Sequence, residues 1–513
     1  MSEYQTYVST RSSDGKSLSF EDAVIRGLAP DGGLYLPREI PKVSAEQLEK
    51  WQDLSFCELA FEVLSLYVSR EEIPAEDLKK LVERSYSTFR AKDVTPVVEL
   101  NKEKQLYLLE LFHGPTYAFK DVALQFVGNL FEYFLQRRNK GKAEDAEDRA
   151  RITVVGATSG DTGSAAIYGL RNKKDVSVFI LFPDGRVSPI QEAQMTTVLD
   201  PNVHTITVKG TFDDCQDLVK QTFNDTEFND KYSVGAVNSI NWARILAQMT
   251  YYFYAYFQVK KQTGEKDPKI KFVVPTGNFG DILAGFYAKR MGLPSGKLVV
   301  ATNSNDILYR FFQDGSYSKS SAGADPVVHA TLSPAMDILV SSNFERFLWY
   351  MAKEHMAKAT EEAGLVINKW MDELKSSGAF NVPQSVLEAA RSELQSERTT
   401  DEQTVETIKH VYTELSPKYI LDPHSAVAVS AAERVSTANP EYNYIALSTA
   451  HPAKFADAVD MALKGQQGYS FEDDVLPQEF KDFSKKEKKN LYAEKPDIEL
   501  LKSIIIEELR KEK

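Results

Sequence analysis

The chain has 513 residues, 42% hydrophobic and 26% charged, which is typical of a globular protein with more than one domain. The formal net charge of −13 argues against non-specific nucleic-acid binding, so an anionic substrate must be met by locally placed cations. The sequence contains no run of about eighteen apolar residues, and we therefore expect no membrane span.

Residues 1–95 form a candidate N-terminal domain. A polar stretch at residues 9–11 is followed by helical spacing from Ser19 to Gly27. Leu34–Leu36 is a candidate strand, and we expect helices between Ala45 and Arg84. The first residues resemble neither a secretory nor a mitochondrial signal.

From residue 96, short β-rich runs alternate with helical segments, which predicts βαβ units and parallel sheets. The strand candidates are Leu106–Leu109, Ile152–Val155, Val176–Leu181, His204–Val208, Phe272–Val274, Leu298–Ala301 and Tyr444–Leu447. So many strands predict two α/β lobes, which we place at residues 96–235 and 236–513. Residues 342–415 are expected as a helical insertion containing a polar loop at Ser396–Glu402, and the last helix, from Pro496, is expected to pack on the body.

Lys120 is the strongest catalytic candidate. Helical spacing places it on an otherwise apolar face with Ala123, Val127, Leu130 and Phe134, so its amine should point inward from the first helical turn. Burial and the positive helix N-terminus both lower a lysine pKa, and a neutral amine can form a Schiff base with a carbonyl. The helix taken alone favours a lysine that reaches the surface.

The first of three loops that support a catalytic Lys120 follows a β run and contains Thr158, Ser159, Gly160, Asp161 and Thr162. Free N–H groups at a helix start, with hydroxyl groups beside them, suit a carboxylate. An ordinary turn between strand and helix, with Asp161 or Thr162 as the N-cap, explains the same residues.

The second loop joins a strand to a helix through Gly277, Asn278, Phe279, Gly280 and Asp281. It lacks the Gly-Lys-Ser/Thr of a P-loop and the Gly-x-Gly-x-x-Gly spacing of a dinucleotide site. A glycine-lined helix start can still bind a phosphate monoester, although tight turns use glycine for backbone reasons as well.

The third loop follows another strand and contains Thr449, whose hydroxyl could bond to a ring nitrogen. We expect His451, Lys454 and His424 to be structural or surface groups. The spacing of the seven histidines does not resemble a metal site.

One cofactor accounts for all of these features. Pyridoxal 5′-phosphate (PLP) needs a lysine for its aldehyde, an anion site for its phosphate and a partner for its ring nitrogen. An amino-acid substrate also needs a carboxylate site. Without the cofactor, the lysine and each of the loops would need a separate structural explanation.

The chain resembles the threonine synthase family in its longer, fungal-type form. The matching segments span nearly the whole length and are, in chain order, Ser9–Arg11, Gly27–Gly33, His113–Asp121, Ala157–Gly163, Asn238–Arg244, Pro275–Asp281 and Ser448–Phe455. The lysine and N-terminal motifs are specific to this family, whereas the glycine loops alone indicate the broader PLP-dependent enzymes of tryptophan-synthase-β-like fold.

This resemblance implies two α/β lobes with PLP between them. Lys120 would bind the cofactor aldehyde, residues 277–281 the cofactor phosphate, and Thr449 would face the ring nitrogen. Residues 158–162 would hold the substrate carboxylate, with Asp161 standing where many relatives of the broader fold carry Asn. The implied substrate-phosphate site contains Asn238, Ser239 and Arg244, and Arg suits phosphate because its planar fork binds two oxygens.

The implied reaction converts O-phospho-L-homoserine and water to L-threonine and inorganic phosphate, by γ-elimination followed by addition at Cβ. The alternatives are a PLP-dependent phospho-lyase or dehydratase that releases 2-oxobutyrate, and a non-catalytic amino-acid-binding relative. The two cysteines form no CxxC pair, which fits a reducing compartment, and we expect a cytoplasmic protein. Nothing in the sequence requires a dimer, so a monomer is expected.

Overall fold

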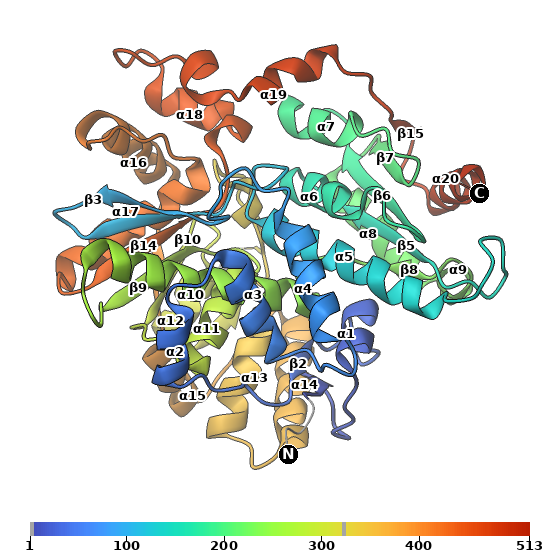
Figure 1. Cartoon of the computed structure of the whole chain (residues 1–513), viewed down its shortest axis with the longest axis horizontal. Helices are drawn as coiled ribbons and strands as arrows, with labels where there is room; N and C mark the ends of the chain where they lie inside the picture. Colours follow the sequence, from blue (N-terminus) through green and yellow to red (C-terminus); the bar gives the residue numbers. More distant parts are fainter. Residues whose placement is uncertain (1–4, 321–324, 513) are drawn as a thin grey trace.

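A computed structural model describes residues 5–320 and 325–512. Two mainly parallel sheets dominate it, and Figure 1 shows them on opposite sides of the molecule, the strands β9, β10 and β14 in one and β5 to β8 in the other. Two long helices, α5 (Lys120–Arg138) and α10 (Trp242–Thr263), lie between the sheets and pack on each other. This arrangement confirms the expected fold class of two α/β lobes.

The larger sheet has six strands. Their order across the sheet is β13 (Leu394–Arg398), β10 (Leu298–Thr302), β9 (Ile270–Pro275), β14 (Asn443–Ser448), β4 (Leu106–Glu110) and β3 (Val97–Asn101). All neighbours are parallel except β3 and β4. The central strands β9, β10 and β14 are buried at every residue, which explains why they are almost continuous apolar runs.

The smaller sheet is entirely parallel. Its order is β15 (Leu491–Ala493), β7 (Val203–Val208), β6 (Val176–Pro183), β5 (Ile152–Ala157) and β8 (Val234–Gly235). All seven strand candidates of the sequence are confirmed as strands of the two sheets. The chain exchanges segments between the sheets, because residues 97–110 belong to the larger sheet and residues 491–493 to the smaller one. The division at residues 96, 235 and 236 therefore does not follow the sheets.

Helices cover both sheets and fill the space between them. Besides α5 and α10 they are α6 (Asp161–Leu170), α7 (Pro189–Thr196), α8 (Phe212–Asn224), α9 (Thr226–Tyr232), α11 (Gly280–Met291), α12 (Ile307–Asp314), α17 (Pro423–Ala438), α18 (Ala456–Leu463), α19 (Gln478–Lys481) and α20 (Ile498–Lys511). Short 3-10 or π turns are η1 (Pro334–Met336), η2 (Pro452–Lys454), η3 (Phe471–Val475) and η4 (Asp482–Lys485). The final helix packs Leu501 and Ile505 against the smaller sheet, as its periodicity predicted.

The N-terminal segment, blue in Figure 1, runs across the lower front of the molecule. Its elements are β1 (Tyr7–Ser9), α1 (Phe20–Arg26), β2 (Tyr35–Pro37), α2 (Ala45–Trp51), α3 (Phe56–Ser65) and α4 (Ala75–Tyr86). The expected strand and helices are confirmed here, and α1 begins at the N-cap Ser19, whose hydroxyl accepts a hydrogen bond from Asp22 N–H.

Residues 342–415 are largely helical but are not a simple insertion. They form α13 (Phe344–His355), α14 (Thr360–Ser377), α15 (Gln384–Glu393) and α16 (Asp401–Glu414), with β12 (Ala379–Asn381) paired to β11 (Ser316–Ser318). The expected polar loop at Ser396–Glu402 is wrong at both ends, because Leu394–Arg398 is the edge strand β13 and α16 begins at Asp401. An edge strand is only half covered, so polar side chains suit it and hide it from a search for apolar runs.

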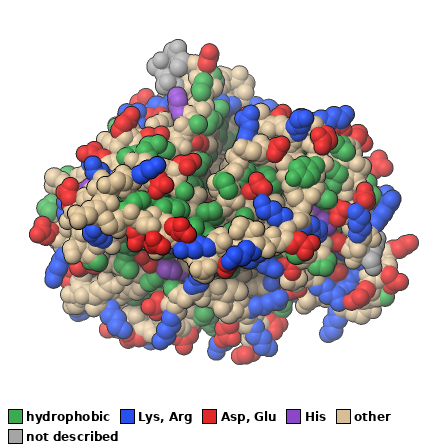
Figure 2. Space-filling view, turned by 90° about the horizontal axis from the view of Figure 1, so that it is seen from above, with side chains coloured by type: hydrophobic (Ala, Val, Ile, Leu, Met, Phe, Trp, Pro, Cys, Tyr) green, Lys and Arg blue, Asp and Glu red, His purple; other side chains and the backbone are tan. Residues whose placement is uncertain are grey.

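Among the described residues, no helix has both the length and the apolar character needed to cross a membrane. On the face seen in Figure 2, acidic and basic side chains are interspersed, and a furrow containing hydrophobic side chains runs between them. On that face the net negative charge is therefore not gathered into one acidic patch.

The cross-packing of α5 and α6 brings two backbones unusually close. A Cβ atom on Gly128 would lie 1.8 Å from the carbonyl oxygen of Gly169, and one on Gly169 would lie 2.5 Å from that of Leu124. Glycine is thus required at the crossing. Since Lys120 begins α5 and Asp161 begins α6, this contact also sets the distance between the two side chains.

Replacing Gly128 by Ala should destabilise the protein by about 1–3 kcal/mol, because overpacking the crossing outweighs the gain in helix propensity. Denaturant unfolding of Gly128→Ala and of the control Gly156→Ala measures the difference. A Cβ on Gly156 meets only Ile180 at an ordinary 3.5 Å. Equal stability of the two variants would contradict the close contact.

Candidate active site

A cavity of about 1190 Å³ opens where loops from both sheets meet. Strands β5, β9 and β14 each end at it, as expected for parallel sheets, which place ligands beyond the carboxyl ends of their strands. The sequence candidates that line it are Lys120, Thr158, Ser159, Asp161, Thr162, Asn238, Ser239, Arg244, Gly277, Asn278, Phe279, Gly280, Asp281 and Thr449. Gly160 packs instead against Gln191, which lies 2.4 Å from the position of a Cβ on that glycine.

Lys120 is the first residue of α5, and part of its surface faces the cavity. Burial among protein atoms lowers its pKa to about 8; Asp161 opposes this shift, and Arg244 adds to it. The preceding turn is fixed by the Asp121 carboxylate, which accepts hydrogen bonds from the N–H and hydroxyl of Thr116, each at 2.7 Å. The lysine thus projects from a rigid turn, and the helical face predicted for it is buried.

Asp161 is a buried carboxylate held by two partners. Its Oδ1 lies 2.7 Å from Lys454 Nζ and accepts a hydrogen bond of 2.9 Å from Gln191. Burial alone raises the pKa of Asp161, but Lys454 and Lys120 outweigh it and hold this pKa below its ordinary value. Asp161 is therefore a charged neighbour of Lys120 whose position is set by Lys454.

Lys454 is a site residue that sequence reasoning missed. Its side chain is fully buried, and besides the ion pair with Asp161 it donates to the carbonyl of Thr116 at 2.8 Å. The expectation of a structural group is correct as far as packing goes, but the alternative of a surface lysine is wrong. Its partners lie hundreds of residues away in sequence, so no local pattern marks it.

The loop of residues 158–162 is shaped by the Thr158 hydroxyl, which accepts from the N–H groups of Gly160 and Gly163 at 3.0 and 2.9 Å. Gly160, rather than Asp161 or Thr162, precedes the first helical residue, and it makes no side-chain cap. In the described parts of the chain, no acceptor is recorded for the N–H groups of Ser159, Asp161 and Thr162. The loop can therefore offer several N–H groups to a carboxylate.

The loop of residues 277–281 turns sharply into α11. Phe279 adopts φ = +64°, which is costly for a residue with a side chain. No acceptor is recorded for the N–H groups of residues 277–280 within the described residues, so a helix start with free donors faces the cavity.

Asp281 contributes a carboxyl group rather than a donor. Its Oδ1 accepts from the hydroxyls of Tyr251 and Tyr252 at 2.5 and 2.8 Å, while Oδ2 has no partner among the described residues. Burial raises its pKa to about 6, although the tyrosine hydroxyls oppose the shift. A half-satisfied carboxyl of this kind is poorly suited to contact a phosphate directly.

Arg244 is buried on α10 and has no carboxylate partner in the described residues. Nη1 donates to the Val237 carbonyl at 3.2 Å, and Nε is unsatisfied. Burial lowers its pKa to about 10, so it remains a cation at neutral pH. A buried guanidinium without an acid is suited to an anionic ligand. Asn238 and Ser239 line the same part of the cavity.

Gln248 is a second residue that the sequence analysis missed. It is 2% exposed, lines the cavity and has an unsatisfied Oε1. It lies four residues after Arg244, so the two side chains share one face of α10. That spacing could have identified it once Arg244 was singled out.

Thr449 follows β14 and lines the cavity. Its carbonyl accepts from Phe119 N–H at 2.8 Å and so joins this loop to the turn before Lys120. His424 is buried and also lines the cavity. Its ring bonds to Asp422 and accepts from Ala335 N–H, which fits a structural role.

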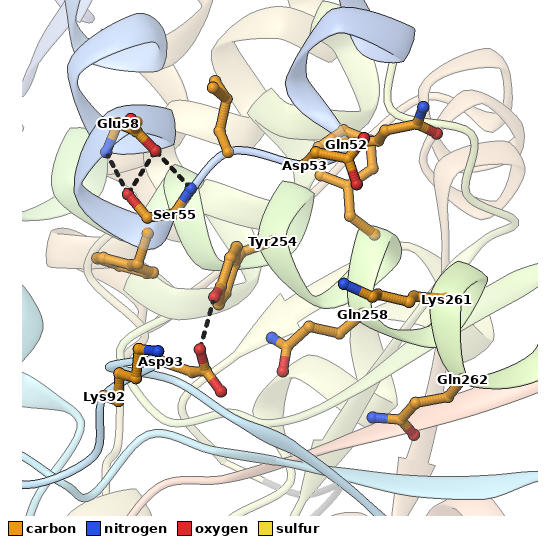
Figure 3. A pocket seen from close by; sticks show the side chains of 13 residues that line it. Gln52, Asp53, Ser55, Glu58, Lys92, Asp93, Tyr254, Gln258, Lys261 and Gln262 are labelled. Carbon is orange, nitrogen blue, oxygen red and sulfur yellow. Dashed lines mark hydrogen bonds between the residues drawn. The ribbon is translucent and has the colours of Figure 1, made fainter.

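A second pocket, of about 500 Å³, lies between the N-terminal segment and α10 (Figure 3). It contains none of the sequence candidates. Two contacts join its side chains, the helix cap formed by Ser55 and Glu58 and the bond from the Tyr254 hydroxyl to Asp93. Its two lysines, Lys92 and Lys261, are exposed, so this pocket lacks the buried cations of the larger cavity.

Comparison with known proteins agrees with the fold. Three family models match, the last two overlapping: threonine synthase N terminus at residues 6–86, pyridoxal-phosphate dependent enzyme at 89–448, and threonine synthase, C-terminal, at 425–505. The threonine synthase of Saccharomyces cerevisiae is 60% identical over 99% of both chains.

Two solved structures are similar over almost the whole chain. The crystal structure of threonine synthase from yeast superposes with a TM-score of 0.94 at 60% identity, covering 99% of each chain. PLP-bound threonine synthase from Brucella melitensis gives a TM-score of 0.87 at 41% identity, covering 99% of this chain and 100% of that one. The chain therefore belongs to the threonine synthase family of PLP-dependent enzymes.

Proposed function

We propose that the large cavity is where the chain converts O-phospho-L-homoserine and water to L-threonine and inorganic phosphate. As a member of its family, the chain is a PLP-dependent enzyme of threonine biosynthesis. The single observation that carries the assignment to this cavity is Lys120, whose pKa is lowered to about 8 and which faces the same space as two loops with free N–H groups.

The cavity offers each group that PLP needs. Lys120 can bind the aldehyde, the free N–H groups of residues 277–280 can hold the phosphate, and the Thr449 hydroxyl can bond to the ring nitrogen. When bound, PLP supplies an electron sink that allows protons to leave the Cα and Cβ atoms of an amino acid. A neutral Thr449 cannot keep the ring nitrogen protonated as a carboxylate would, which favours elimination and replacement over transamination.

The side chain of Asp281 does not suit direct contact with a phosphate. Its carboxyl group is directed to Tyr251 and Tyr252, and an anion would repel a phosphate. We propose that Asp281 acts on the cofactor phosphate only through its N–H group and the start of α11.

Lys120 is proposed to move the protons of the reaction. An amine with a pKa near 8 can both accept a proton from Cα and return one near neutral pH. Asp161, fixed by Lys454, keeps a negative charge beside it and prevents the pKa from falling further. This is the role we propose for Asp161, beside the carboxylate-binding N–H groups of residues 158–162.

Arg244 is proposed to hold the γ-phosphate of the substrate and stabilise its charge as it leaves. Its unpaired guanidinium, together with Asn238 and Ser239, would provide charge-assisted hydrogen bonds to phosphate oxygens. Gln248, on the same helical face, would add an amide donor. Water then enters at Cβ.

The oligomeric state, the location and the domain division belong to the same proposal. We propose a monomer, because the candidate residues for the cofactor and the substrate meet in one cavity within a single chain. We propose a cytoplasmic location, supported by the free thiols of Cys57 and Cys215. We also propose the units 1–95, 96–235 and 236–513 as domains, with the exchanged strands β3, β4 and β15 crossing between them.

The purified protein with PLP and O-phosphohomoserine should release threonine and phosphate in equal amounts, and Lys120→Ala should release neither. Amino-acid analysis with a phosphate assay measures both products. Predominant 2-oxobutyrate would instead identify a lyase, and PLP binding without any turnover would identify a non-catalytic relative.

Arg244→Gln should lower kcat/KM for O-phosphohomoserine by roughly 30-fold or more, because a buried charge–phosphate contact is lost. Steady-state kinetics measures the loss, and PLP content should remain normal. The control is Arg149→Gln, which breaks an ion pair with Asp175 outside the cavity and should lower stability alone. Unchanged kcat/KM in Arg244→Gln would remove Arg244 from the phosphate site.

In the protein without PLP, Asp161→Asn should lower the pKa of Lys120 below 8. The variant loses the negative charge that favours the ammonium form and leaves the cation of Lys454 unbalanced. The rate of labelling by an amine reagent as a function of pH, followed peptide by peptide, gives this pKa.

Lys173 provides an internal control in the same samples. Burial lowers its pKa to about 8 as well, but the charges that act on it are Arg84 and Glu132 rather than Asp161. Its labelling should be the same in both proteins. A Lys120 pKa that rises in the variant would contradict the assigned role of Asp161.

A further inference from the structure

The turn that begins helix α13 contacts both of the loops that are proposed to bind phosphate. Asn343 and Arg346 lie in the segment expected as a helical insertion, residues 342–415, and neither of them lines the cavity. We infer that Asn343 and Arg346 are positioning residues that orient the peptide groups of the cofactor-phosphate and substrate-phosphate loops. The inference rests on the proposed function, because it concerns the two anion sites assigned there.

Asn343 joins the two loops directly. Its side-chain Nδ2 donates to the carbonyls of Ser239 and Asn278 at 3.1 and 3.0 Å, and its backbone N–H also donates to Asn278 at 3.1 Å. The residue is 0% exposed. One buried amide therefore bonds to a loop on each side of the site.

These bonds determine where the N–H groups point. A peptide unit is planar, with its C=O and N–H directed to opposite sides. Holding the Asn278 carbonyl on Asn343 therefore directs the Phe279 N–H the other way. Ser341 does the same one residue earlier, since its hydroxyl donates to the Gly277 carbonyl at 2.6 Å and so orients the Asn278 N–H.

The contacts also maintain a strained conformation. Phe279 has φ = +64°, which persists in a folded protein only when the surroundings over-determine it. Asn343 packs against the next residue as well, because a Cβ on Gly280 would lie 3.5 Å from Asn343 Nδ2.

Arg346 fixes the orientation of Asn343. Its Nη1 donates to Asn343 Oδ1 at 2.6 Å, which leaves the Nδ2 group of Asn343 to face the loop carbonyls. Its Nη2 donates to the Ile240 carbonyl at 2.7 Å, and its Nε to the Tyr35 carbonyl at 2.7 Å.

Arg346 donates all of these hydrogen bonds to neutral acceptors. The residue is 0% exposed, and no ion pair with it is recorded among the described residues. Simple helix packing would be served at lower cost by an apolar side chain. Arg346 instead donates to three oxygens from separate segments of the chain. We therefore infer that it holds these segments in a defined geometry.

The N-terminal segment enters the same network through α13. The Glu345 carboxylate accepts from the Arg11 guanidinium at 2.7 and 3.0 Å and from the Thr10 hydroxyl at 2.5 Å. The polar stretch at residues 9–11 thus has a structural partner next to Arg346. It anchors the helix that positions the loops.

The test compares two ligands that differ only in the phosphate. In the protein stripped of PLP, Asn343→Ala should weaken PLP binding about tenfold or more, which corresponds to the loss of about 1.4 kcal/mol. Pyridoxal, which lacks the phosphate, should bind as it does to the wild type. Fluorescence titration measures both affinities, and inhibition of the holoenzyme by inorganic phosphate should weaken by a similar factor.

Two further variants make the result independent of folding defects. Ser341→Ala removes one carbonyl contact at smaller structural cost and should show the same preference against PLP to a lesser degree. Arg346→Lys keeps the charge but cannot reach three acceptors, so it should resemble Asn343→Ala. The matched control is Asn129→Ala, a buried asparagine bonded to Ser85 and Lys173 away from the cavity, which should lower thermal stability without changing either affinity.

Equal losses of PLP and pyridoxal affinity, or no loss beyond that of Asn129→Ala, would overturn the inference. That outcome is distinguishable from failure of the proposed function, which would appear in the wild type as absence of threonine formation. If the wild type makes threonine but the variants lose PLP and pyridoxal affinity equally, only the positioning role is rejected.

Discussion

The site depends on a lysine ammonium that is taken out of water without a carboxylate of its own. If Lys120 were buried without any negative charge nearby, its pKa would fall further. If Asp161 bound Lys120 alone, the ion pair would raise the pKa of the lysine. Lys454 competes for the same carboxylate, because its Nζ lies 2.7 Å from Asp161 Oδ1. Burial lowers the pKa of Lys120 from its ordinary 10.5 to about 8, while Asp161 limits the shift and the cations of Arg244 and Lys454 add to it.

This balance requires accurate distances, which the fold supplies through backbone contacts. Lys120 and Asp161 each begin a helix, and the two helices cross where Gly128 meets Gly169. The Thr116 carbonyl accepts from Lys454, so the turn before Lys120 is tied to the loop after β14. The carboxyl ends of parallel strands bring the loops to one place, and these contacts decide their separation.

Much of the fold follows from local sequence, because buried parallel strands are continuous apolar runs. The candidate loops that reach the cavity also follow from it, because they come directly after such strands. What local patterns cannot reveal is a partner distant in the chain. Lys454 looks like a surface lysine until Asp161 is placed beside it, and β13 looks like a polar loop because an edge strand needs no apolar run. Gln248 is different, because its position four residues after Arg244 places both side chains on one face of a helix, and the sequence alone shows this spacing. Asn343 and Arg346 were hidden because their acceptors are backbone carbonyls, which every residue possesses.

Backbone carbonyls as acceptors also explain why an anion site needs residues that never touch the anion. A loop that offers N–H groups must first direct its C=O groups elsewhere, and buried carbonyls need donors. At residues 277–279 these donors are Ser341 and Asn343, and Arg346 keeps the amide of Asn343 turned the right way. Because the loop has its binding geometry before the ligand arrives, binding loses no conformational entropy in ordering it, and the affinity is higher. The helical segment and the N-terminal strands, which contribute no cavity side chains of their own, are thereby part of the binding site in energetic terms.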